Sequence, residues 1–175
     1  MNDQIKKYIR TVPDFPKPGI NFYDITTLLQ DPTGFHMAVD LMEKFVRAKK
    51  PQKIVAVEAR GFIFGAALAD RLRIGVAVAR KPGKLPYQTV SQEYELEYGS
   101  DNIVLHADAV LPGERIVVVD DLIATGGTLE AVCRLVERLG GEVVGVSTVI
   151  DLSFLPWREK LKKYEVNYLI SYDSE

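Results

Sequence analysis

The sequence has few of the features that mark secreted, membrane-spanning or disulfide-stabilised proteins. Cys133 is the one cysteine among 175 residues, so no internal disulfide can form and a reducing compartment is expected. No apolar run approaches the roughly 18 residues that cross a membrane. The first ten residues, MNDQIKKYIR, have no apolar stretch after their charges, which argues against a secretory signal. We therefore expect a cytoplasmic protein that has no membrane partner.

The sequence also lacks a large net charge. The 22 lysines and arginines against 24 aspartates and glutamates give a formal net charge of -2. No overall attraction to nucleic acid is expected, so any anion site must be local. A chain of 175 residues is long enough to bury a core. We expect a single domain over residues 1–175.

What the sequence does contain is an alternation of strand and helix patterns. Strands are expected at 53–58, 75–80, 115–121, 142–150 and 166–172, and helices at 61–72, 128–140 and about 155–162. Runs such as Ile116 to Val119 are continuously β-branched, which is typical of strands buried on both faces of a parallel sheet. The pattern predicts an α/β fold whose central sheet is mostly parallel and flanked by helices.

The first fifty residues are less regular. Apolar residues at helical spacing predict a short helix over 2–10. Three prolines and a glycine make residues 11–26 too broken for regular structure, yet their apolar content predicts an ordered flap. Asp31 as N-cap and Pro32 at the first helical position predict a second helix that ends near Lys50.

A Pro/Gly-rich polar loop follows the strand at 75–80 and leads into residues 92–107, which alternate between apolar and polar. This alternation predicts an antiparallel hairpin that projects beyond the sheet. His106 lies on the hairpin and His36 on the helix after Asp31. Neither histidine has clustered partners in the sequence, and we assign both to structure.

The most informative segment is VVVDDLIATGGT, residues 117–128. Ligands of open α/β sheets bind beyond the carboxyl ends of the strands, where two adjacent carboxylates stand in this segment. Buried carboxylates need donors, and vicinal ribose hydroxyls would supply two. The following ATGGT offers backbone N–H groups, threonine hydroxyls and the positive end of a helix, which suit a phosphate. The candidate residues for a sugar phosphate are Asp120, Asp121, Ala124, Thr125, Gly126, Gly127 and Thr128.

ATGGT by itself is equally consistent with a plain joint between strand and helix, in which Thr128 caps the helix. The paired aspartates favour the sugar phosphate. The sequence has neither GxxxxGK[ST] nor GxGxxG, so it supports neither a Walker-type ATP site nor a dinucleotide fold. The apolar run, the two acids and ATGGT together resemble the phosphoribosyl pyrophosphate signature of type I phosphoribosyltransferases.

Four further segments, DFPKPGINFYDIT, EARGFIFG, RKPGKLP and YELEYG, resemble in order segments of the adenine phosphoribosyltransferase family. The resemblance implies the type I phosphoribosyltransferase fold, with an N-terminal hood over about 11–30 and a projecting lid loop and hairpin over about 81–107. It also implies transfer of 5-phosphoribosyl from phosphoribosyl pyrophosphate to N9 of adenine, giving AMP and pyrophosphate, in a homodimer. Near the end of the chain, Pro156 and Trp157 stand where the family has small residues, often glycine.

In that family the hood covers the purine. The resemblance implies that Phe22 stacks on adenine while backbone groups of Asn21 and Tyr23 bind its edge. A backbone C=O and N–H would supply the acceptor and donor that select adenine. The alternative role for Phe22 is to fill the core.

EARGF places a strand end and a helix start together, an arrangement that suits pyrophosphate. The resemblance assigns pyrophosphate binding to Ala59, Arg60, Arg80, Lys81 and Lys84. The family usually has serine where Ala59 stands, so only the backbone contact is carried over. The alternative for the basic residues at 80–84 is that they lie on a solvated loop. The resemblance implies instead that Arg80 or Lys81 reaches the pyrophosphate of the neighbouring subunit.

The chemistry is expected to need Mg²⁺, held mainly by substrate oxygens and through water by Asp120 and Asp121, with no direct protein ligand. Arg60, Lys81 and Glu97 are the residues that we expect to be catalytic. By analogy Glu97 lies beside the purine imidazole and handles its proton, and Glu95 is its rival on the same strand face.

Two other functions fit parts of this pattern. The first is a phosphoribosyltransferase for another base, such as hypoxanthine, guanine or xanthine, because only the hood distinguishes the bases. The second is a non-catalytic regulator that senses phosphoribosyl pyrophosphate. The chain has no basic face for DNA and keeps both the lid segment and Glu97, which favours the enzyme.

The role assigned to Glu97 leads to a direct test. Glu97→Gln is expected to slow the chemical step while donor binding stays nearly intact, because the amide cannot accept the purine proton. Steady-state turnover together with donor affinity measures both effects. A normal turnover number would place the proton role elsewhere.

Overall fold

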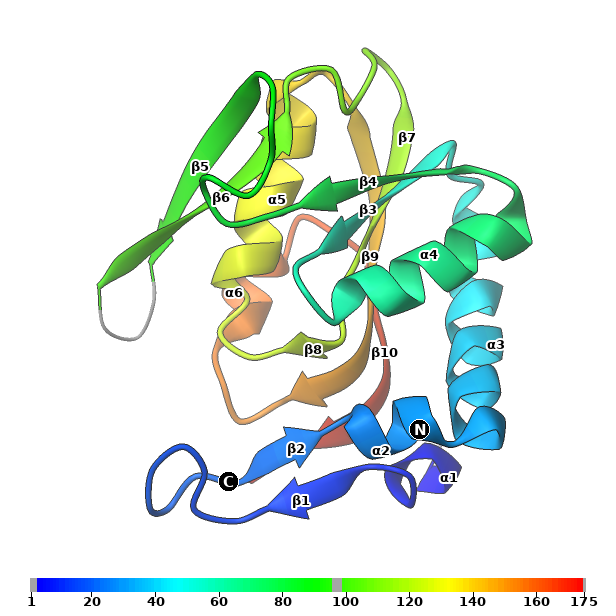
Figure 1. Cartoon of the computed structure of the whole chain (residues 1–175), viewed down its shortest axis with the longest axis vertical. Helices are drawn as coiled ribbons and strands as arrows, with labels where there is room; N and C mark the ends of the chain where they lie inside the picture. The colour runs from blue at the N-terminus through cyan, green and yellow to red at the C-terminus, as the bar shows by residue number, and fades with distance from the viewer. Residues whose placement is uncertain (1–2, 96–98, 175) are drawn as a thin grey trace.

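The structure, a computed structural model, describes residues 3–95 and 99–174. Within these residues the main element is a six-stranded parallel sheet, in which β10, β9, β7, β3 and β4 are neighbours in that order and β8 pairs with β9 (Figure 1). The strands are β3 (Lys53–Val57), β4 (Gly75–Ala79), β7 (Arg115–Val119), β8 (Leu122–Ile123), β9 (Glu142–Leu152) and β10 (Val166–Tyr172). The expected α/β fold is confirmed, and β8 is an addition to it.

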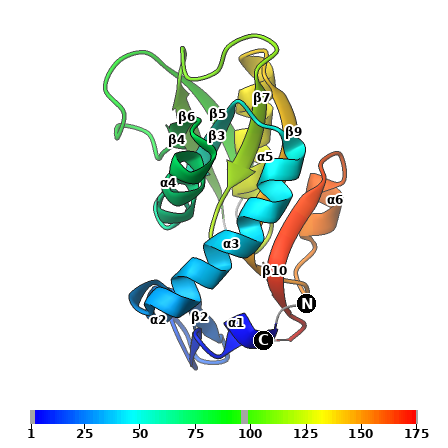
Figure 2. The same ribbon diagram turned by 90° about the vertical axis from the view of Figure 1, so that its right-hand side faces the viewer.

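Helices cover both faces of this sheet (Figure 2). They are α3 (Pro32–Lys49) and α4 (Gly61–Leu72) on one face, and α5 (Gly127–Arg138) and α6 (Trp157–Leu161) on the other. In β3, Ile54 and Ala56 pack toward the first pair while Val55 and Val57 pack toward the second, and all four are buried. Burial on both faces explains why the strands are continuously apolar. None of the helices in the described part of the chain is long and apolar enough to cross a membrane.

The N-terminal region contains more regular structure than the sequence predicts. Its elements are α1 (Asp3–Lys6), β1 (Arg10–Val12), β2 (Phe22–Asp24) and α2 (Thr26–Gln30). The predicted helix over 2–10 is wrong beyond Lys6, because Arg10 already pairs with Asp24 in an antiparallel ladder and forms an ion pair with its carboxylate. The three prolines of this region, Pro13, Pro16 and Pro18, lie between the two short strands, because a proline has no N–H to donate to a ladder.

This β1–β2 hairpin lies at the carboxyl end of β10 (Figure 1). Tyr23 is buried and stacks on Tyr172, the last residue of β10, with ring centroids 3.6 Å apart and an interplanar angle of 18°. Hydrogen bonds from Arg10 and Thr26 lower the pKa of Asp24 to about 2. The segment that the sequence marks as a flap is therefore fixed at the ligand-binding edge of the sheet.

The second hairpin consists of β5 (Thr89–Glu95) and β6 (Ser100–His106), which pair antiparallel as expected. A backbone bridge between Arg80 and Val104 joins it to the end of β4. The hairpin projects beyond the sheet, as the sequence predicts (Figure 1), and its strands also pack against α5. The buried side chains of Tyr94, Ile103 and Leu105 account for this packing.

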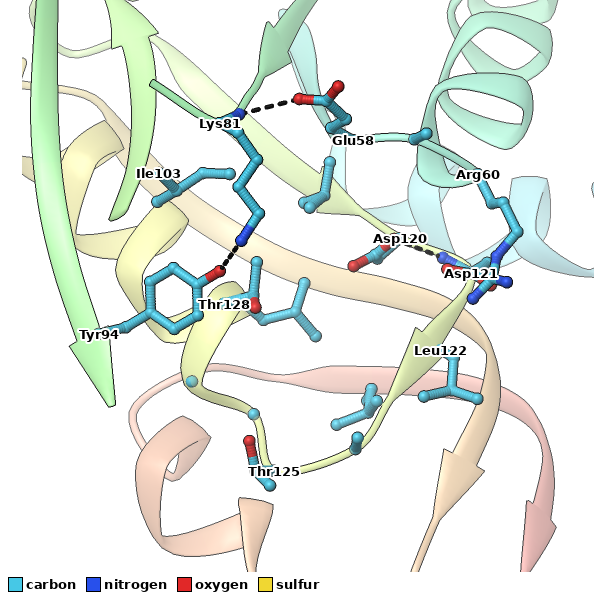
Figure 3. A pocket seen from close by; sticks show the side chains of 17 residues that line it. Glu58, Arg60, Lys81, Tyr94, Ile103, Asp120, Asp121, Leu122, Thr125 and Thr128 are labelled. Atoms are coloured by element: carbon cyan, nitrogen blue, oxygen red, sulfur yellow. Dashed lines mark hydrogen bonds and ion pairs between the residues drawn. The ribbon is translucent and has the colours of Figure 1, made fainter. Parts of the chain in front are cut away.

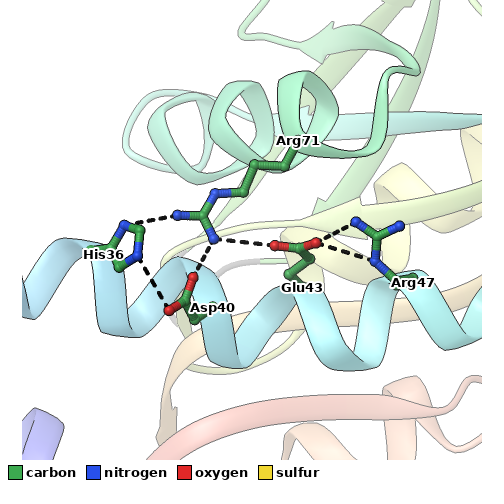
Figure 4. Close-up of polar contacts among 5 residues, drawn as sticks. All are labelled: His36, Asp40, Glu43, Arg47 and Arg71. Carbon is green, nitrogen blue, oxygen red and sulfur yellow. Dashed lines mark hydrogen bonds and ion pairs between the residues drawn. The ribbon is translucent and has the colours of Figure 1, made fainter.

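A polar cluster on the surface joins α3 to α4 (Figure 4). His36 Nε2 lies 3.4 Å from Asp40 Oδ2, and Arg71 Nη2 lies 2.9 Å from His36 Nδ1. Arg71 also forms ion pairs with Asp40 and Glu43. The expectation that His36 has no clustered partners is wrong, because Arg71 reaches it from another helix.

The start of α3 generates a stability prediction. The Asp31 side chain accepts a hydrogen bond of 2.8 Å from the Gly34 N–H, and Pro32 is the first helical residue, as the sequence predicts. Asp31→Ala is expected to lower the free energy of unfolding by about 1 kcal/mol, as measured in urea. Asp31→Asn keeps the capping oxygen and serves as the control. Equal losses in both variants would contradict the cap.

Candidate active site

A cavity of about 430 Å³ lies at the carboxyl ends of β3 and β7 (Figure 3). It is lined by the segments 57–60 and 120–129 together with Lys81, Tyr94 and Ile103. Parallel strands bring their carboxyl ends to one edge of the sheet, so these distant segments meet there. All seven residues that the sequence assigns to a sugar phosphate line this cavity.

Asp120 and Asp121 follow β7 at the floor of the cavity, and both are buried. The Asp121 N–H donates to Asp120 Oδ1 at 2.9 Å. Burial, and then the neighbouring Asp121 carboxylate, raises the pKa of Asp120 well above its ordinary value. Asp121 Oδ2 lies 2.6 Å from Arg60 Nε in an ion pair, but no well-aligned hydrogen bond from the described residues reaches this oxygen. One oxygen of the pair therefore has an ion-pair partner but no well-aligned hydrogen-bond donor.

The loop after the aspartates turns into α5 at two glycines. Gly126 is the N-cap, with φ of 75° in the left-handed region, and α5 begins at Gly127, one residue before the predicted start at Thr128. No described side chain caps this helix end. Its first N–H groups, which have no partners within the helix, therefore remain available to a ligand.

The first turn of α4 packs directly on the aspartates. A Cβ added at Gly61 would lie 2.8 Å from Asp120 Oδ1 and 2.9 Å from the Val119 carbonyl oxygen. Only glycine permits this approach, which brings the preceding Ala59 and Arg60 to the wall of the cavity. The peptide bond between Glu58 and Ala59 is cis.

Of the basic residues at positions 80–84, only Lys81 is among the described residues that line the cavity. Lys81 lines the cavity, where its Nζ lies 2.6 Å from the Tyr94 hydroxyl and forms an ion pair with Asp101. Arg80 is turned to Glu58, which accepts 2.8 Å hydrogen bonds from the Arg80 guanidinium and from the Lys81 N–H. These bonds lower the pKa of Glu58. Arg80 and the exposed Lys84 are not among the described residues that line the cavity.

The residues assigned to the purine are not among the described residues that line the cavity, although Phe22 lies next to one that does. The Phe22 ring lies 5.6 Å from the Arg60 guanidinium and meets Phe15 edge to face, with centroids 5.2 Å apart. Asn21 is partly exposed, and the Tyr23 side chain points to Tyr172. Glu97, and with it the proton role predicted for it, lies outside the described residues.

Sequence reasoning did not single out Tyr94, Ile103 or Asp101 as residues of this site. Tyr94 and Ile103 line the cavity, and Asp101 holds Lys81. The alternation in the hairpin marks Tyr94 and Ile103 as inward-facing, but only the packing of the hairpin on α5 brings them to the cavity. Asp101 is opposite Tyr94 in the ladder, a register that the sequence does not specify.

Comparison with known proteins identifies the family. The model of the phosphoribosyl transferase domain family matches residues 24–169. The adenine phosphoribosyltransferase of Desulfitobacterium hafniense is 56% identical over 166 residues, which cover 95% of this chain and 96% of that protein. The chain belongs to the adenine phosphoribosyltransferase family. The adenine phosphoribosyltransferase of Acetivibrio thermocellus is 53% identical and matches 96% of this chain and 99% of its own.

Solved structures of the adenine phosphoribosyltransferase family have the same fold. The enzyme of Thermoanaerobacter pseudethanolicus superposes with a TM-score of 0.94 at 50% identity, covering 98% of this chain and 100% of that one. The Saccharomyces cerevisiae enzyme, complexed with an imino-altritol bisphosphate and adenine, gives a TM-score of 0.89 at 36% identity, covering 96% and 97%. The expected type I phosphoribosyltransferase fold is therefore confirmed.

The raised pKa of Asp120 generates a prediction about stability and pH. A carboxyl with a raised pKa holds its proton more tightly in the folded state, so its contribution to stability is lost as pH rises above the ordinary value of about 3.9. Asp120→Asn cannot ionise. Without ligand it is expected to melt at a higher temperature than the parent at about pH 8, and by a smaller margin at about pH 5.

Asp108→Asn, on an exposed turn, is the control for the general effect of removing a negative charge. Thermal unfolding of the three proteins across the pH range is the measurement. A margin for Asp120→Asn that stays constant with pH, or one that Asp108→Asn shares, would contradict the burial of an ionised Asp120.

Proposed function

We propose that the chain transfers 5-phosphoribosyl from phosphoribosyl pyrophosphate to N9 of adenine, giving AMP and pyrophosphate. The observation that carries this proposal is one cavity in which two buried carboxylates, one with an oxygen that no well-aligned hydrogen bond reaches, adjoin an uncapped helix start. A ribose supplies the hydroxyl donors and its 5′-phosphate supplies the anion. Membership of the adenine phosphoribosyltransferase family supports the same reaction.

The ribose hydroxyls would donate to Asp120 and Asp121, and the 5′-phosphate would accept hydrogen bonds from the loop 124–128. A donor hydroxyl at Asp121 Oδ2 would satisfy the oxygen that the described residues leave without a well-aligned bond. Threonine hydroxyls at both ends of the glycine pair, Thr125 and Thr128, add donors to the backbone N–H groups.

The pyrophosphate would bind at the opposite wall, against the Ala59 backbone, Arg60 and Lys81. Arg60 forms an ion pair with Asp121 here, and a donor hydroxyl would free its guanidinium for the leaving group. Lys81 is the one member of the 80–84 cluster among the described lining residues. Arg80 and Lys84 belong to this subsite in our proposal only through movement of the loop, because Glu58 now holds Arg80.

Mg²⁺ fits this site as a metal carried by the substrate. The described residues contain no cluster of three or more His, Cys, Asp or Glu side chains that could hold a metal directly. Asp120 and Asp121 offer the hard oxygen donors that Mg²⁺ prefers and would hold it through water. Bound to the donor, Mg²⁺ would offset the negative charge of the departing pyrophosphate.

Adenine would bind between the cavity and the β1–β2 hairpin. Phe22 is adjacent to Arg60 and would stack on the purine, with backbone groups of Asn21 and Tyr23 at its edge. Support comes from the Saccharomyces cerevisiae enzyme, whose solved structure is a complex with an imino-altritol bisphosphate and adenine. Glu97 would accept the N9 proton, a role that remains a prediction from the sequence.

The lid would protect the reaction from water. Positive charge develops on the ribose as the bond from C1′ to pyrophosphate oxygen breaks and N9 bonds to C1′, so water at this point would hydrolyse the donor. We propose that the loop from Lys81 into the hairpin closes over the site, with its base held at Glu58. The homodimer and the cytoplasmic location likewise remain predictions.

The test is to incubate the protein with adenine, phosphoribosyl pyrophosphate and Mg²⁺ and to measure AMP. Formation of AMP is expected, with hypoxanthine, guanine and xanthine as poor acceptors. If the protein turns over one of those bases and not adenine, that base is the substrate. Tight donor binding, seen as a thermal shift, without any transfer would favour a regulator.

A variant tests the ribose assignment directly. Asp121→Asn is expected to reduce turnover by about tenfold or more while the protein remains folded, because one charged hydrogen bond to the ribose is weakened. Asp108→Asn again makes the same chemical change at an exposed turn and should retain full activity. Full activity in Asp121→Asn would defeat the ribose assignment.

A further inference from the structure

A further buried carboxylate, that of Asp151, lies behind the proposed phosphate loop and is not among the described residues that line the cavity. Asp151, near the end of β9, is fully buried and accepts three side-chain hydrogen bonds. The Trp157 indole N–H donates to its Oδ1 at 2.6 Å, and Ser171 and Arg158 donate to its Oδ2 at 3.0 and 3.2 Å. Unlike the aspartates of the cavity, Asp151 has its donors within the chain. The Asp151 carboxylate therefore stabilises the packing of α6 against the sheet.

Trp157 connects this carboxylate to the loop. A Cβ added at Gly126 would lie 3.0 Å from Trp157 Cβ and 3.3 Å from Trp157 Cα, so the first residue of α6 packs directly on the N-cap of α5. The indole is 5% exposed, meets the Tyr168 ring edge to face and carries the Arg158 guanidinium 4.5 Å from its centroid. The tryptophan is thus held on several sides.

Asp151 also adjoins the other end of the loop. The two residues of β8 pair with β9 in the register Leu122 to Ile150 and Ile123 to Asp151. The loop begins at Ala124, directly after this pairing, and joins α5 at Gly126 and Gly127, where Trp157 packs against Gly126. The backbone of Asp151 therefore anchors the entry to the loop, and its side chain anchors the exit through the indole.

We propose that Asp151 and Trp157 are positioning residues that hold the 124–127 backbone in the conformation that binds the 5′-phosphate. A loop that is already fixed loses little conformational entropy when the anion binds, and its N–H groups keep their directions. Weakening the support should therefore weaken binding of the ribose phosphate and leave pyrophosphate binding unaffected. The inference rests on the proposed function, since it takes the loop to be the 5′-phosphate subsite.

The experiment measures the affinity of the purified protein for ribose 5-phosphate and for pyrophosphate with Mg²⁺, separately, by calorimetry. Trp157→Phe keeps most of the ring but removes the donor to Asp151. It is expected to weaken ribose 5-phosphate binding by about 3- to 10-fold, which is less than the full effect of one hydrogen bond to a charged group because the loss reaches the phosphate only through the loop. Pyrophosphate binding should stay within about twofold. Asp151→Asn still offers an oxygen to the indole N–H, so it should lose less affinity for ribose 5-phosphate than Asp151→Leu does.

Leu161→Ala is the matched control. Leu161 is buried in the same short helix and its truncation loosens α6 without removing the indole hydrogen bond. If Leu161→Ala weakens ribose 5-phosphate binding as much as Trp157→Phe, or if Trp157→Phe leaves it unchanged, the positioning role is wrong. AMP formation by the same variants distinguishes the failures. Transfer activity in the parent with unaltered ribose 5-phosphate affinity in Trp157→Phe would overturn this inference alone.

The parent protein offers a second readout that needs no variant. Trp157 is the one tryptophan in the sequence, so its fluorescence reports the environment of the loop. Ribose 5-phosphate at concentrations that saturate the site by calorimetry should change the emission, and pyrophosphate should change it less. Equal changes with both ligands, or none with ribose 5-phosphate, would contradict the proposed contact.

Discussion

Two adjacent carboxylates buried at the end of β7 constrain the rest of the site. Asp120 and Asp121 cannot both be ionised there without compensation, as the raised pKa of Asp120 indicates. The structure compensates in part, with the ion pair from Arg60 and the bond from the Asp121 N–H. In our proposal, the oxygen of Asp121 that lacks a well-aligned donor is where a ligand hydroxyl binds.

The support around these carboxylates differs from one side of the cavity to the other. Toward α4, Gly61 lets the backbone approach so closely that Arg60 reaches Asp121. Toward α5, the loop has glycine at the cap and a tryptophan behind it. Toward the hairpin, Asp101 and Tyr94 hold Lys81. Cationic side chains and backbone N–H groups therefore surround the two carboxylates. In our proposal the ligand's hydroxyls bind the carboxylates and its phosphates bind the cations and N–H groups.

How much of this was predictable varies with the kind of interaction. The helix from Pro32 and the strands of the sheet follow from caps and from continuous apolar runs, because these signals are local. The ladder between β1 and β2 was missed, because its stability comes from contacts such as Tyr23 on Tyr172, whose partner is near the other end of the chain. The partners of His36 were missed for the same reason.

By itself, the sequence determined the strand-loop-helix unit that contains Asp120, Asp121 and ATGGT, because carboxylates, glycines and a helix start act within a dozen residues. Only the tertiary structure decided that Arg60 lies against Asp121, that Lys81 and not Arg80 lines the cavity, and that Trp157 supports Gly126. Those contacts join segments tens of residues apart. They depend on the order and register of the parallel strands, which no local pattern specifies.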